Sequence, residues 1–375
     1  MKHAKLSASA SSRWLNCPGS VSANEGLVDS GSSYANWGSC AHEVAEKCLI
    51  ELRAAKNYLG DVFHGVVVDS EMIECVQTYV DYVKQFGGEH FYEQQVDFSP
   101  WVPEGFGTSD AIVIDGHTLR IIDLKSGQGV RVDAEENTQA QLYALGAIND
   151  YGAFLNIEKV FIAIVQPRLD HISEWELPLE KLLDFGEKAK ISAKKALSPN
   201  AERVPGDKQC QWCKAKAICP ALYNLTQTTL LQSFEVIDID SLPKLNQLTE
   251  SQLKLALDNR KLIESWLSSV EQYATEQILD GKNIGGYKLV EGRSVRQWID
   301  EQHAEQVLSE RFDESDLYKK TFVSVAQAEK LLGKKQADLL DELVTKPQGK
   351  PTLAPASDKR PPIGANISDF DACND

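Results

Sequence analysis

Apolar residues recur at two different spacings along the first third of the chain. Spacings of three and four positions predict amphipathic helices over about 37–53 and about 70–86. The spacing then changes to every second position, which predicts three consecutive strands over 91–98, 107–114 and 118–124. The chain therefore begins with helices and continues into a sheet whose first three strands follow one another directly.

A helix and two further strands are expected after these three strands. Asp133 and Glu136 form a capping pair that would open a helix ending near Ile148. The nearly uniform apolar run 160–165 is typical of a buried central strand, and 172–177 is typical of an edge strand. This order predicts an α/β fold with a mixed central sheet flanked by helices.

The C-terminal part of the chain has a different pattern. We expect a first domain over residues 1–230, which ends with a cysteine-rich segment. Thr249 and Gln252 form a capping box before a long apolar stripe, which predicts a mainly helical accessory region over 231–345. Residues 346–375 hold five prolines and almost no apolar periodicity, so we expect a flexible tail there.

Composition and charge narrow the class of protein. Of the 375 residues, 42% are hydrophobic and 25% are charged, which is ordinary for a soluble protein with a core. The sequence has no apolar run long enough to cross a membrane and no apolar signal peptide, so we expect a cytoplasmic protein without a membrane partner. The net charge of −16 argues against indiscriminate coating of nucleic acid, but it allows a local basic groove or a metal that neutralises phosphate.

One predicted hairpin brings two carboxylates together. If Gly116 and His117 are the central residues of a two-residue turn, Asp110 lies directly opposite Asp123, and Lys125 joins them on the same sheet face. Carboxylates in such a pair repel each other, and a divalent cation with oxygen ligands is a natural compensation. A solvated edge is the alternative, which the apolar neighbours of both acids disfavour. A three-residue loop would break the alignment.

The hairpin also resembles a known family. A G-x-x-D sequence at Gly107 to Asp110, followed by a strand ending in D-x-K at Asp123 to Lys125, resembles the PD-(D/E)XK nuclease superfamily and its RecB-like branch. The resemblance covers roughly residues 7–225, and the overall layout resembles an uncharacterised, phage-associated family of RecB-like proteins. Further positions of that branch are matched, in order along the chain, by Gly38, His42, Glu93, Gln139 and Tyr143.

The resemblance implies a restriction-endonuclease-like core and a role for each matched residue. Mg²⁺ or Mn²⁺ would be held by His42, Asp110, Asp123 and the carbonyl of Leu124, and the imidazole favours Mn²⁺. Lys125 would orient the attacking water or stabilise the developing negative charge. Glu93 could complete the shell of a second metal. Gln139 and Tyr143, on one face of a helix, would position the DNA strand, although core packing is the competing explanation for Tyr143.

Three cysteines lie close together in Cys210-x-x-Cys213-x5-Cys219. Clustered thiolates suit Zn²⁺ or an iron–sulfur cluster, and the spacing alone does not separate the two. A fourth ligand has to come from elsewhere in the chain. The candidates are Cys17, Cys40, Cys48, Cys75 and Cys373.

A second resemblance favours one of these candidates. AddB-type subunits and CRISPR-associated RecB-like nucleases hold a [4Fe–4S] cluster with one cysteine before the nuclease core and three after it. Cys17 stands at the matching position, so the resemblance implies a cluster on Cys17, Cys210, Cys213 and Cys219, with zinc as the less favoured occupant. Such a cluster would join the two ends of the nuclease core and act as a structural staple. Cys40, Cys48 and Cys75 are expected to be small buried hydrophobic residues.

These patterns together predict a metal-dependent deoxyribonuclease. The resemblance implies an exonuclease on single-stranded DNA or DNA ends in phage recombination, repair or replication, with a recombination or replication protein as a partner. The alternatives are a structure-specific endonuclease and a non-catalytic iron–sulfur protein that binds DNA or acts as a scaffold. Basic and aromatic residues around an expected strand at 285–291 suit either single-stranded DNA or a solvated hairpin, and we favour the hairpin.

Overall fold

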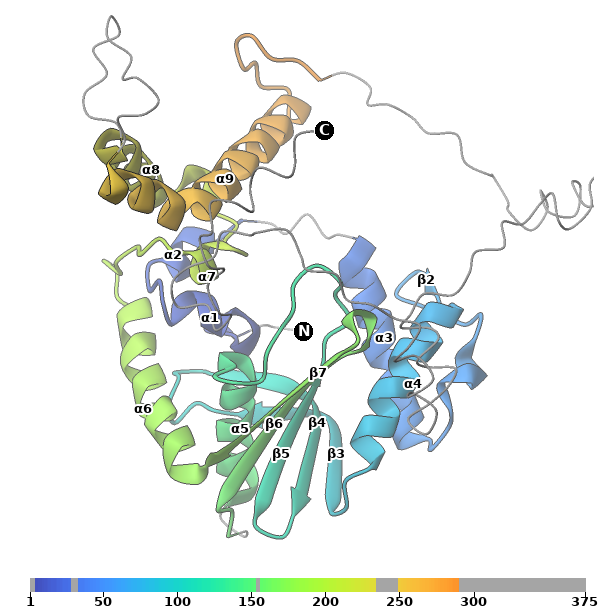
Figure 1. Cartoon of the computed structure of the whole chain (residues 1–375). Coiled ribbons are helices and arrows are strands. Elements are labelled where there is room, and N and C mark those ends of the chain that lie inside the picture. The colour runs from blue at the N-terminus through green and yellow to red at the C-terminus, as the bar shows by residue number, and fades with distance from the viewer. Residues whose placement is uncertain (1–3, 28–32, 153–155, 234–248, 290–375) are drawn as a thin grey trace, which may run out of the picture. The chain divides into compact units, whose positions relative to one another are not determined.

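The computed structural model describes residues 4–27, 33–152, 156–233 and 249–289, all of which belong to one compact unit, Met1–Leu289 (Figure 1). The part of the predicted accessory region beyond residue 289 and the predicted tail lie outside the described residues. At the centre is a five-stranded sheet in the order β3-β4-β5-β6-β7. Its pairs are antiparallel except β5 and β6, which are parallel. The strands are β3 (Glu89–Asp97), β4 (Phe106–Asp115), β5 (Thr118–Leu124), β6 (Lys159–Gln166) and β7 (His171–Pro178).

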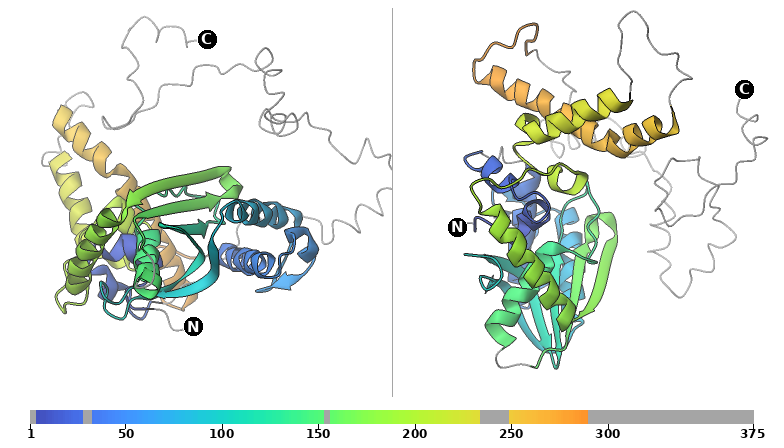
Figure 2. Two further views of the ribbon diagram at one scale, coloured as in Figure 1. Left: turned by 90° about the horizontal axis from the view of Figure 1, so that it is seen from below. Right: turned by 90° about the vertical axis from the view of Figure 1, so that its left-hand side faces the viewer.

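Helices cover both faces of this sheet (Figures 1 and 2). Alternate residues of β4 enter different cores, so that Ile112 packs with α5 on one face and Val113 packs with α3 and α4 on the other. The mixed α/β fold and the flanking helices are therefore confirmed. The helices around the sheet are α3 (Ser33–Ile50), α4 (Ser70–Lys84), α5 (Thr138–Tyr151) and α6 (Leu179–Ala196).

The hairpin between β4 and β5 has the predicted register. Asp115 pairs with Thr118, which makes Gly116 and His117 the two central residues of the turn. Gly116 has φ of 57°, as the first central residue of a type II′ turn requires. The paired part of the ladder ends one position before Asp110 and Asp123, so these two acids occupy opposite positions where the strands begin to separate.

Two local predictions are wrong. Helix α5 begins at Thr138 and is capped by Asn137, whose Oδ1 accepts a hydrogen bond of 3.0 Å from the Ala140 N–H. Glu136 lies in the left-handed region with φ of 56°, so it precedes the helix instead of capping it. Residues 285–289 form no strand, because Gly286, at φ of 84°, turns the backbone there.

The remaining described elements lie outside the central layers. The capping box of Thr249 and Gln252 is confirmed, and it opens α9 (Glu250–Leu279). Helix α9 packs on α8 (Pro220–Ser233) around a small core that includes Leu222, Leu262 and Cys210. None of the described helices has the length and apolar character needed to cross a membrane. The shorter elements are η1 (Ala8–Ala10), α1 (Ser11–Trp14), α2 (Ser20–Asn24), η2 (Ala55–Tyr58), β1 (Val62–Phe63), β2 (Val66–Val67), η4 (Pro167–Leu169), α7 (Asp207–Cys210) and η5 (Lys216–Ile218).

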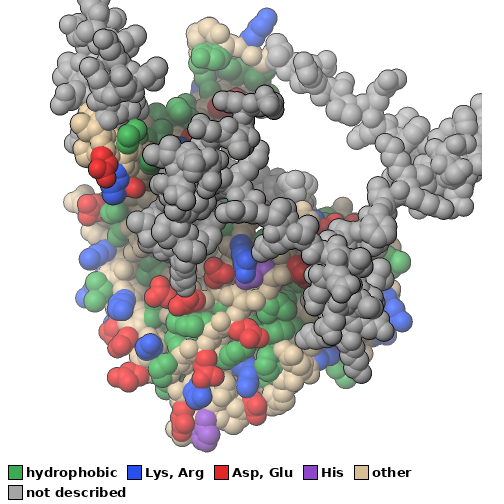
Figure 3. Space-filling model, viewed as in Figure 1, with side chains coloured by type: hydrophobic (Ala, Val, Ile, Leu, Met, Phe, Trp, Pro, Cys, Tyr) green, Lys and Arg blue, Asp and Glu red, His purple; other side chains and the backbone are tan. Residues whose placement is uncertain are grey.

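The described part of the face drawn in Figure 3 has no broad patch of basic side chains. Acidic and basic side chains alternate there with hydrophobic ones over the sheet. A protein that coats DNA needs a continuous positive surface, which this part of the face does not offer. Binding of a polyanion here would have to depend on a local site.

Candidate metal centre and cysteine cluster

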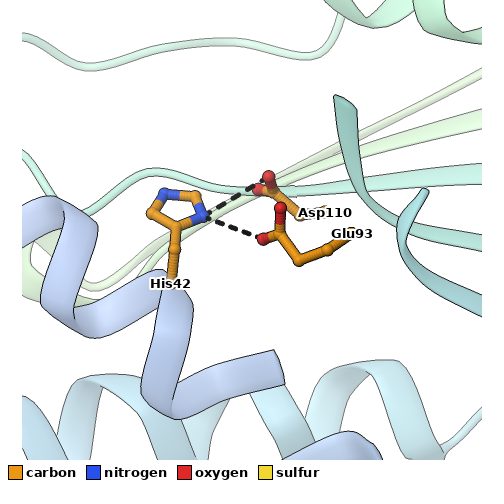
Figure 4. A group of neighbouring side chains, drawn as sticks. All are labelled: His42, Glu93 and Asp110. Atoms are coloured by element: carbon orange, nitrogen blue, oxygen red, sulfur yellow. Dashed lines mark ion pairs between the residues drawn. The ribbon is translucent and has the colours of Figure 1, made fainter. Parts of the chain in front are cut away.

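Three potential metal ligands converge from three different elements (Figure 4). His42 projects from α3, Glu93 from β3 and Asp110 from β4. The Nδ1 atom of His42 lies 3.4 Å from Asp110 Oδ1 and 3.8 Å from Glu93 Oε1. The three ligand atoms lie within 4.8 Å of one another, a spacing that suits a single cation. The structure thus brings together three of the residues singled out in the sequence.

The other site residues form a chain of contacts next to this group. The Nζ atom of Lys125 lies 2.7 Å from Asp123 Oδ2 and donates a hydrogen bond of 3.2 Å to Gln139 Oε1. The Gln139 amide in turn donates to the Tyr143 hydroxyl at 3.0 Å. Asp123 is therefore paired with Lys125 and is not one of the three grouped ligands. Tyr143 is also buried in the core, so the packing and site explanations both apply to it.

Asp110 connects the two groups through its second oxygen. Asp110 Oδ2 accepts a hydrogen bond of 2.7 Å from the backbone N–H of Leu124, between Asp123 and Lys125. The Lys125 N–H continues the parallel ladder by donating to the Val165 carbonyl at 2.9 Å. Backbone hydrogen bonds therefore hold the D-x-K strand against Asp110, which fixes the relative positions of both acids and the lysine.

The charges of the site determine the pKa values of its members. Burial favours neutral His42, but the charge and hydrogen bond of Asp110, with Glu93, outweigh burial and raise the pKa of His42 to about 10. Burial opposes the ionisation of Asp110 too, yet the positive charges of His42 and Lys125 lower its pKa. Burial raises the pKa of Asp123, and the charge of Asp110 adds to this effect, although Lys125 acts in the opposite direction. The pKa of Asp110 is therefore lowered and the pKa of Asp123 is raised.

Backbone features explain why these side chains can approach one another. Glu93 has φ of 45° in the middle of β3, a left-handed conformation that costs a non-glycine residue free energy and is often found at functional sites. A Cβ at Gly38 would lie 2.9 Å from Ser126 Oγ, next to Lys125. A Cβ at Gly107 would lie 2.8 Å from the Tyr143 ring. Both glycines of the sequence motifs therefore allow close packing against site elements.

Sequence reasoning missed two residues that hold the segment after Lys125. The buried amide of Gln166 donates to the carbonyls of Gly127 and Val130 at 2.8 and 2.9 Å, and its oxygen accepts from the Val132 N–H at 3.1 Å. Arg168 donates to the Ser126 carbonyl at 3.3 Å, and its guanidinium also pairs with Glu71 on α4 and lies over the Trp37 ring on α3. No spacing rule identifies such isolated polar residues.

The four cysteines expected to act together line one cavity. They are Cys17, Cys210, Cys213 and Cys219. Cys17 Sγ accepts a hydrogen bond of 3.3 Å from the Val204 N–H, and Cys210 Sγ accepts one of 3.4 Å from the Gly206 N–H. Asn24, which sequence reasoning also missed, donates from Nδ2 to Cys213 Sγ at 3.2 Å. Cys40, Cys48 and Cys75 are buried in the α3–α4 core, as expected for small hydrophobic residues.

The spacing of the four sulfurs bears on the group that they could hold. Burial raises the pKa of Cys17 and of Cys210, and the neighbouring thiols add to this in both cases. A single Zn²⁺ would hold four sulfurs at about 2.3 Å from one centre, whereas a four-iron cluster binds each thiolate to a different iron and spreads them further apart, so the sulfur spacing of the loaded protein separates the two.

Comparison with known proteins identifies the family but not its activity. A model of a family described as "Protein of unknown function (DUF2800)" matches residues 3–361, so the chain belongs to that family. A solved structure titled "Crystal structure of SSO0001" is similar over 57% of this chain and 85% of its own, with 16% sequence identity and a TM-score of 0.23. A likeness with so low a TM-score carries no argument about the fold or the function.

Proposed function

We propose that this family member is a metal-dependent deoxyribonuclease of the PD-(D/E)XK type and RecB-like branch. The observation that carries the proposal is the convergence of His42, Glu93 and Asp110 beside the buried pair of Asp123 and Lys125. A cation site next to a fixed ammonium group suits the hydrolysis of a phosphodiester, whose transition state gains negative charge.

The donor set fits Mg²⁺ or Mn²⁺. Two carboxylates and one imidazole already lie within reach of a single ion, and the Asp123 carboxylate and the Leu124 carbonyl are the proposed additional ligands. When bound, the metal would polarise the scissile phosphate and acidify a water molecule. The Leu124 N–H holds one oxygen of Asp110 and leaves the other directed at His42, so the backbone determines which oxygen is available.

Lys125 would act through its charge and not as a base. Burial opposes protonation of its amine, but the charges of Asp123 and Asp110 outweigh burial and raise its pKa. The lysine therefore carries a proton at neutral pH and can donate hydrogen bonds to water or to phosphate oxygen. Gln139 orients the ammonium group through its Oε1 atom, and Tyr143 orients Gln139. In this proposal the pair of Gln139 and Tyr143 also lies against the DNA strand.

We propose that the four-cysteine cavity holds a [4Fe–4S] cluster. Support comes from the common cavity and from the N–H groups directed at its sulfurs. The described cysteines form no disulfides, which is consistent with a reducing compartment and with the proposed cytoplasmic location. Single-stranded DNA or DNA ends, met during phage recombination, repair or replication, are the proposed substrate, and a recombination or replication protein is the proposed partner.

One experiment tests the nuclease proposal directly. Anaerobically purified protein is incubated with end-labelled linear and circular DNA, single- and double-stranded, with Mn²⁺, with Mg²⁺ and with EDTA. We expect metal-dependent degradation of linear single strands from an end and no degradation in EDTA, and Asp110→Asn should be inactive in every reaction. Cleavage of circles would identify an endonuclease instead. Absence of cleavage on all substrates by cluster-loaded protein would contradict the proposal and favour a DNA-binding or scaffold role.

A further inference from the structure

A buried hydroxyl lies unpartnered beside the cysteines. Ser20, at the start of α2, is 2% exposed, and its Oγ atom has no hydrogen-bond partner among the described residues. Buried hydroxyl groups in folded proteins are nearly always hydrogen-bonded, because leaving one unpaired costs free energy. Ser20 also lines the cavity formed by the four cysteines. An unpaired donor in that position points to a ligand that occupies the cavity.

The backbone around Ser20 is packed tightly against the segment that carries Val204. The Gly19 N–H donates to the Glu202 carbonyl at 2.7 Å, and a Cβ at Gly19 would lie within 2.8 Å of two backbone oxygens of this segment. This close approach brings the Val204 N–H to the Cys17 sulfur. A hydrogen bond from the Ser20 backbone also acts on the Cys17 thiol and lowers its pKa, against the larger effect of burial. Ser20 is thus fixed next to one cysteine.

Three other donors beside the cysteines already have sulfur acceptors. They are the N–H groups of Val204 and Gly206 and the side-chain amide of Asn24, which contact Cys17, Cys210 and Cys213 respectively. Asn24 lies one helical turn after Ser20 and donates to its carbonyl at 2.7 Å, so both side chains come from the same short helix. Among the buried side-chain atoms that lack a partner in the described residues, the Ser20 hydroxyl is the one that lines this cavity.

We propose that the Ser20 hydroxyl donates a hydrogen bond to a sulfur of the cluster and thereby stabilises its reduced state. The inference rests on the proposed iron–sulfur cluster, and it does not depend on nuclease activity. One-electron reduction adds negative charge to the cluster, and donors directed at its sulfurs stabilise that charge. Removal of one donor therefore makes reduction harder and lowers the reduction potential.

The test is a redox titration of the intact protein with dithionite, followed by electron paramagnetic resonance. Ser20→Ala should bind as much iron and sulfide as the unaltered protein but be reduced at a more negative potential. Ser20→Thr retains a hydroxyl, so its reduction potential should lie close to that of the unaltered protein. Ser109→Ala is the matched control, because Ser109 is also fully buried with an unpartnered hydroxyl but does not line the cysteine cavity. Its potential should be unchanged.

The outcomes separate this inference from the proposals on which it rests. A brown Ser20→Ala protein with an unaltered potential would overturn the role of Ser20 and leave the cluster assignment in place. A colourless protein that contains zinc would overturn both. If Ser20→Ala does not load, the isosteric pair Ser20→Thr and Ser20→Val decides the question, because the two side chains fill the same space and only threonine carries a hydroxyl. Equal reduction potentials for these two variants would contradict the proposal.

Discussion

At the scale of single residues, two carboxylates of the same chemistry have opposite electrostatic environments. Asp110 faces His42 and receives a backbone N–H, and its pKa is lowered. Asp123 is 2% exposed, and its pKa is raised despite Lys125. When the pKa of a carboxyl is higher in the folded than in the unfolded protein, its ionisation makes the fold less stable. Ionised Asp123 therefore destabilises the metal-free fold at neutral pH. Such a cost is expected if Asp123 is a metal ligand, as proposed.

Asp123→Asn should therefore separate function from stability. The substitution removes a ligand and keeps the shape of the side chain, so we expect cleavage to fall by about 100-fold or more. The melting temperature of the metal-free protein should change little, because the loss of an unfavourable buried carboxylate is opposed by the loss of the partner of the Lys125 ammonium group. Calorimetry with EDTA and a cleavage assay with Mn²⁺ measure the two effects.

Asp115→Asn is the matched control for this prediction. Asp115 belongs to the same hairpin, but it pairs with Thr118 at the turn, away from the ligand group, and is exposed. Its cleavage rate should equal that of the unaltered protein. Full activity in Asp123→Asn, or a loss of activity in Asp115→Asn of equal size, would contradict the assignment of Asp123.

Gln166→Glu tests whether the segment after Lys125 has to be held in place. A carboxylate cannot donate to the carbonyls of Gly127 and Val130, and both would then face a negative oxygen. We expect a loss of about 1–3 kcal/mol of stability and a 10- to 100-fold fall in kcat. Gln141→Glu is the control, because Gln141 is also buried but makes a single 3.3 Å contact with Asn137 within its own helix. Equal effects of both variants on kcat would indicate general destabilisation.

At the scale of secondary-structure elements, the hydrophobic pattern predicted the sheet and its hairpin register well. Neighbouring residues of β4 are buried in different cores, one on each face of the sheet, and Gly116, with its positive φ, suits the first central position of a two-residue turn. The start of α5 was misplaced because several residues near it can cap a helix. Asn137 does so in the structure, and Glu136 adopts a left-handed conformation before it. Local propensity does not decide between neighbouring caps.

The candidate site was predictable only where its residues fall into spaced motifs. His42, Asp110 and Lys125 belong to such motifs, and the structure brings them to the same end of the sheet. Gln166 and Ser20 act through contacts with distant backbone or with the cysteine cavity. Single polar residues of this kind have no sequence signature, because their partners are determined by the tertiary fold.

Gly19→Ala should show that packing between two short segments supports the cluster. Gly19 has an ordinary φ of −66°, so its importance is steric: an added Cβ would lie 2.6 Å from the Ala201 carbonyl oxygen. We expect about 1–3 kcal/mol of destabilisation and a lower iron content, because Val204 moves away from Cys17. Gly87→Ala is the control, since no atom lies within 4 Å of a Cβ there. Normal iron content in Gly19→Ala would contradict this view.

At the scale of the whole molecule, the cysteine cavity joins parts of the chain that are far apart in sequence. Cys17 precedes every strand of the sheet, and Cys210 follows the last helix that packs on it. Cys210 also belongs to the small core between α8 and α9. A group bound by all four thiols would therefore tie the N-terminal segment, the central sheet with its helices and the C-terminal helices together.

Substitution of a cysteine before the sheet and substitution of a cysteine after it should both prevent binding of the proposed cluster. Cys17→Ala and Cys213→Ala should both abolish the brown colour that the proposed cluster gives, because each removes one of its four ligands. The chain-entropy model sets an upper limit of about 5 kcal/mol on the stability that such a closure supplies. We expect each variant to lose most of it.

Cys40→Ala removes a fully buried sulfur from the α3–α4 core and should keep its colour, with a loss of about 1 kcal/mol. Iron content, absorbance near 400 nm and thermal unfolding without oxygen measure these effects. A brown Cys17→Ala protein beside a bleached Cys40→Ala protein would show that the fourth ligand is Cys40. Zinc in place of iron in the unaltered protein would retain the closure but change its occupant, and chelation should then unfold the same segments.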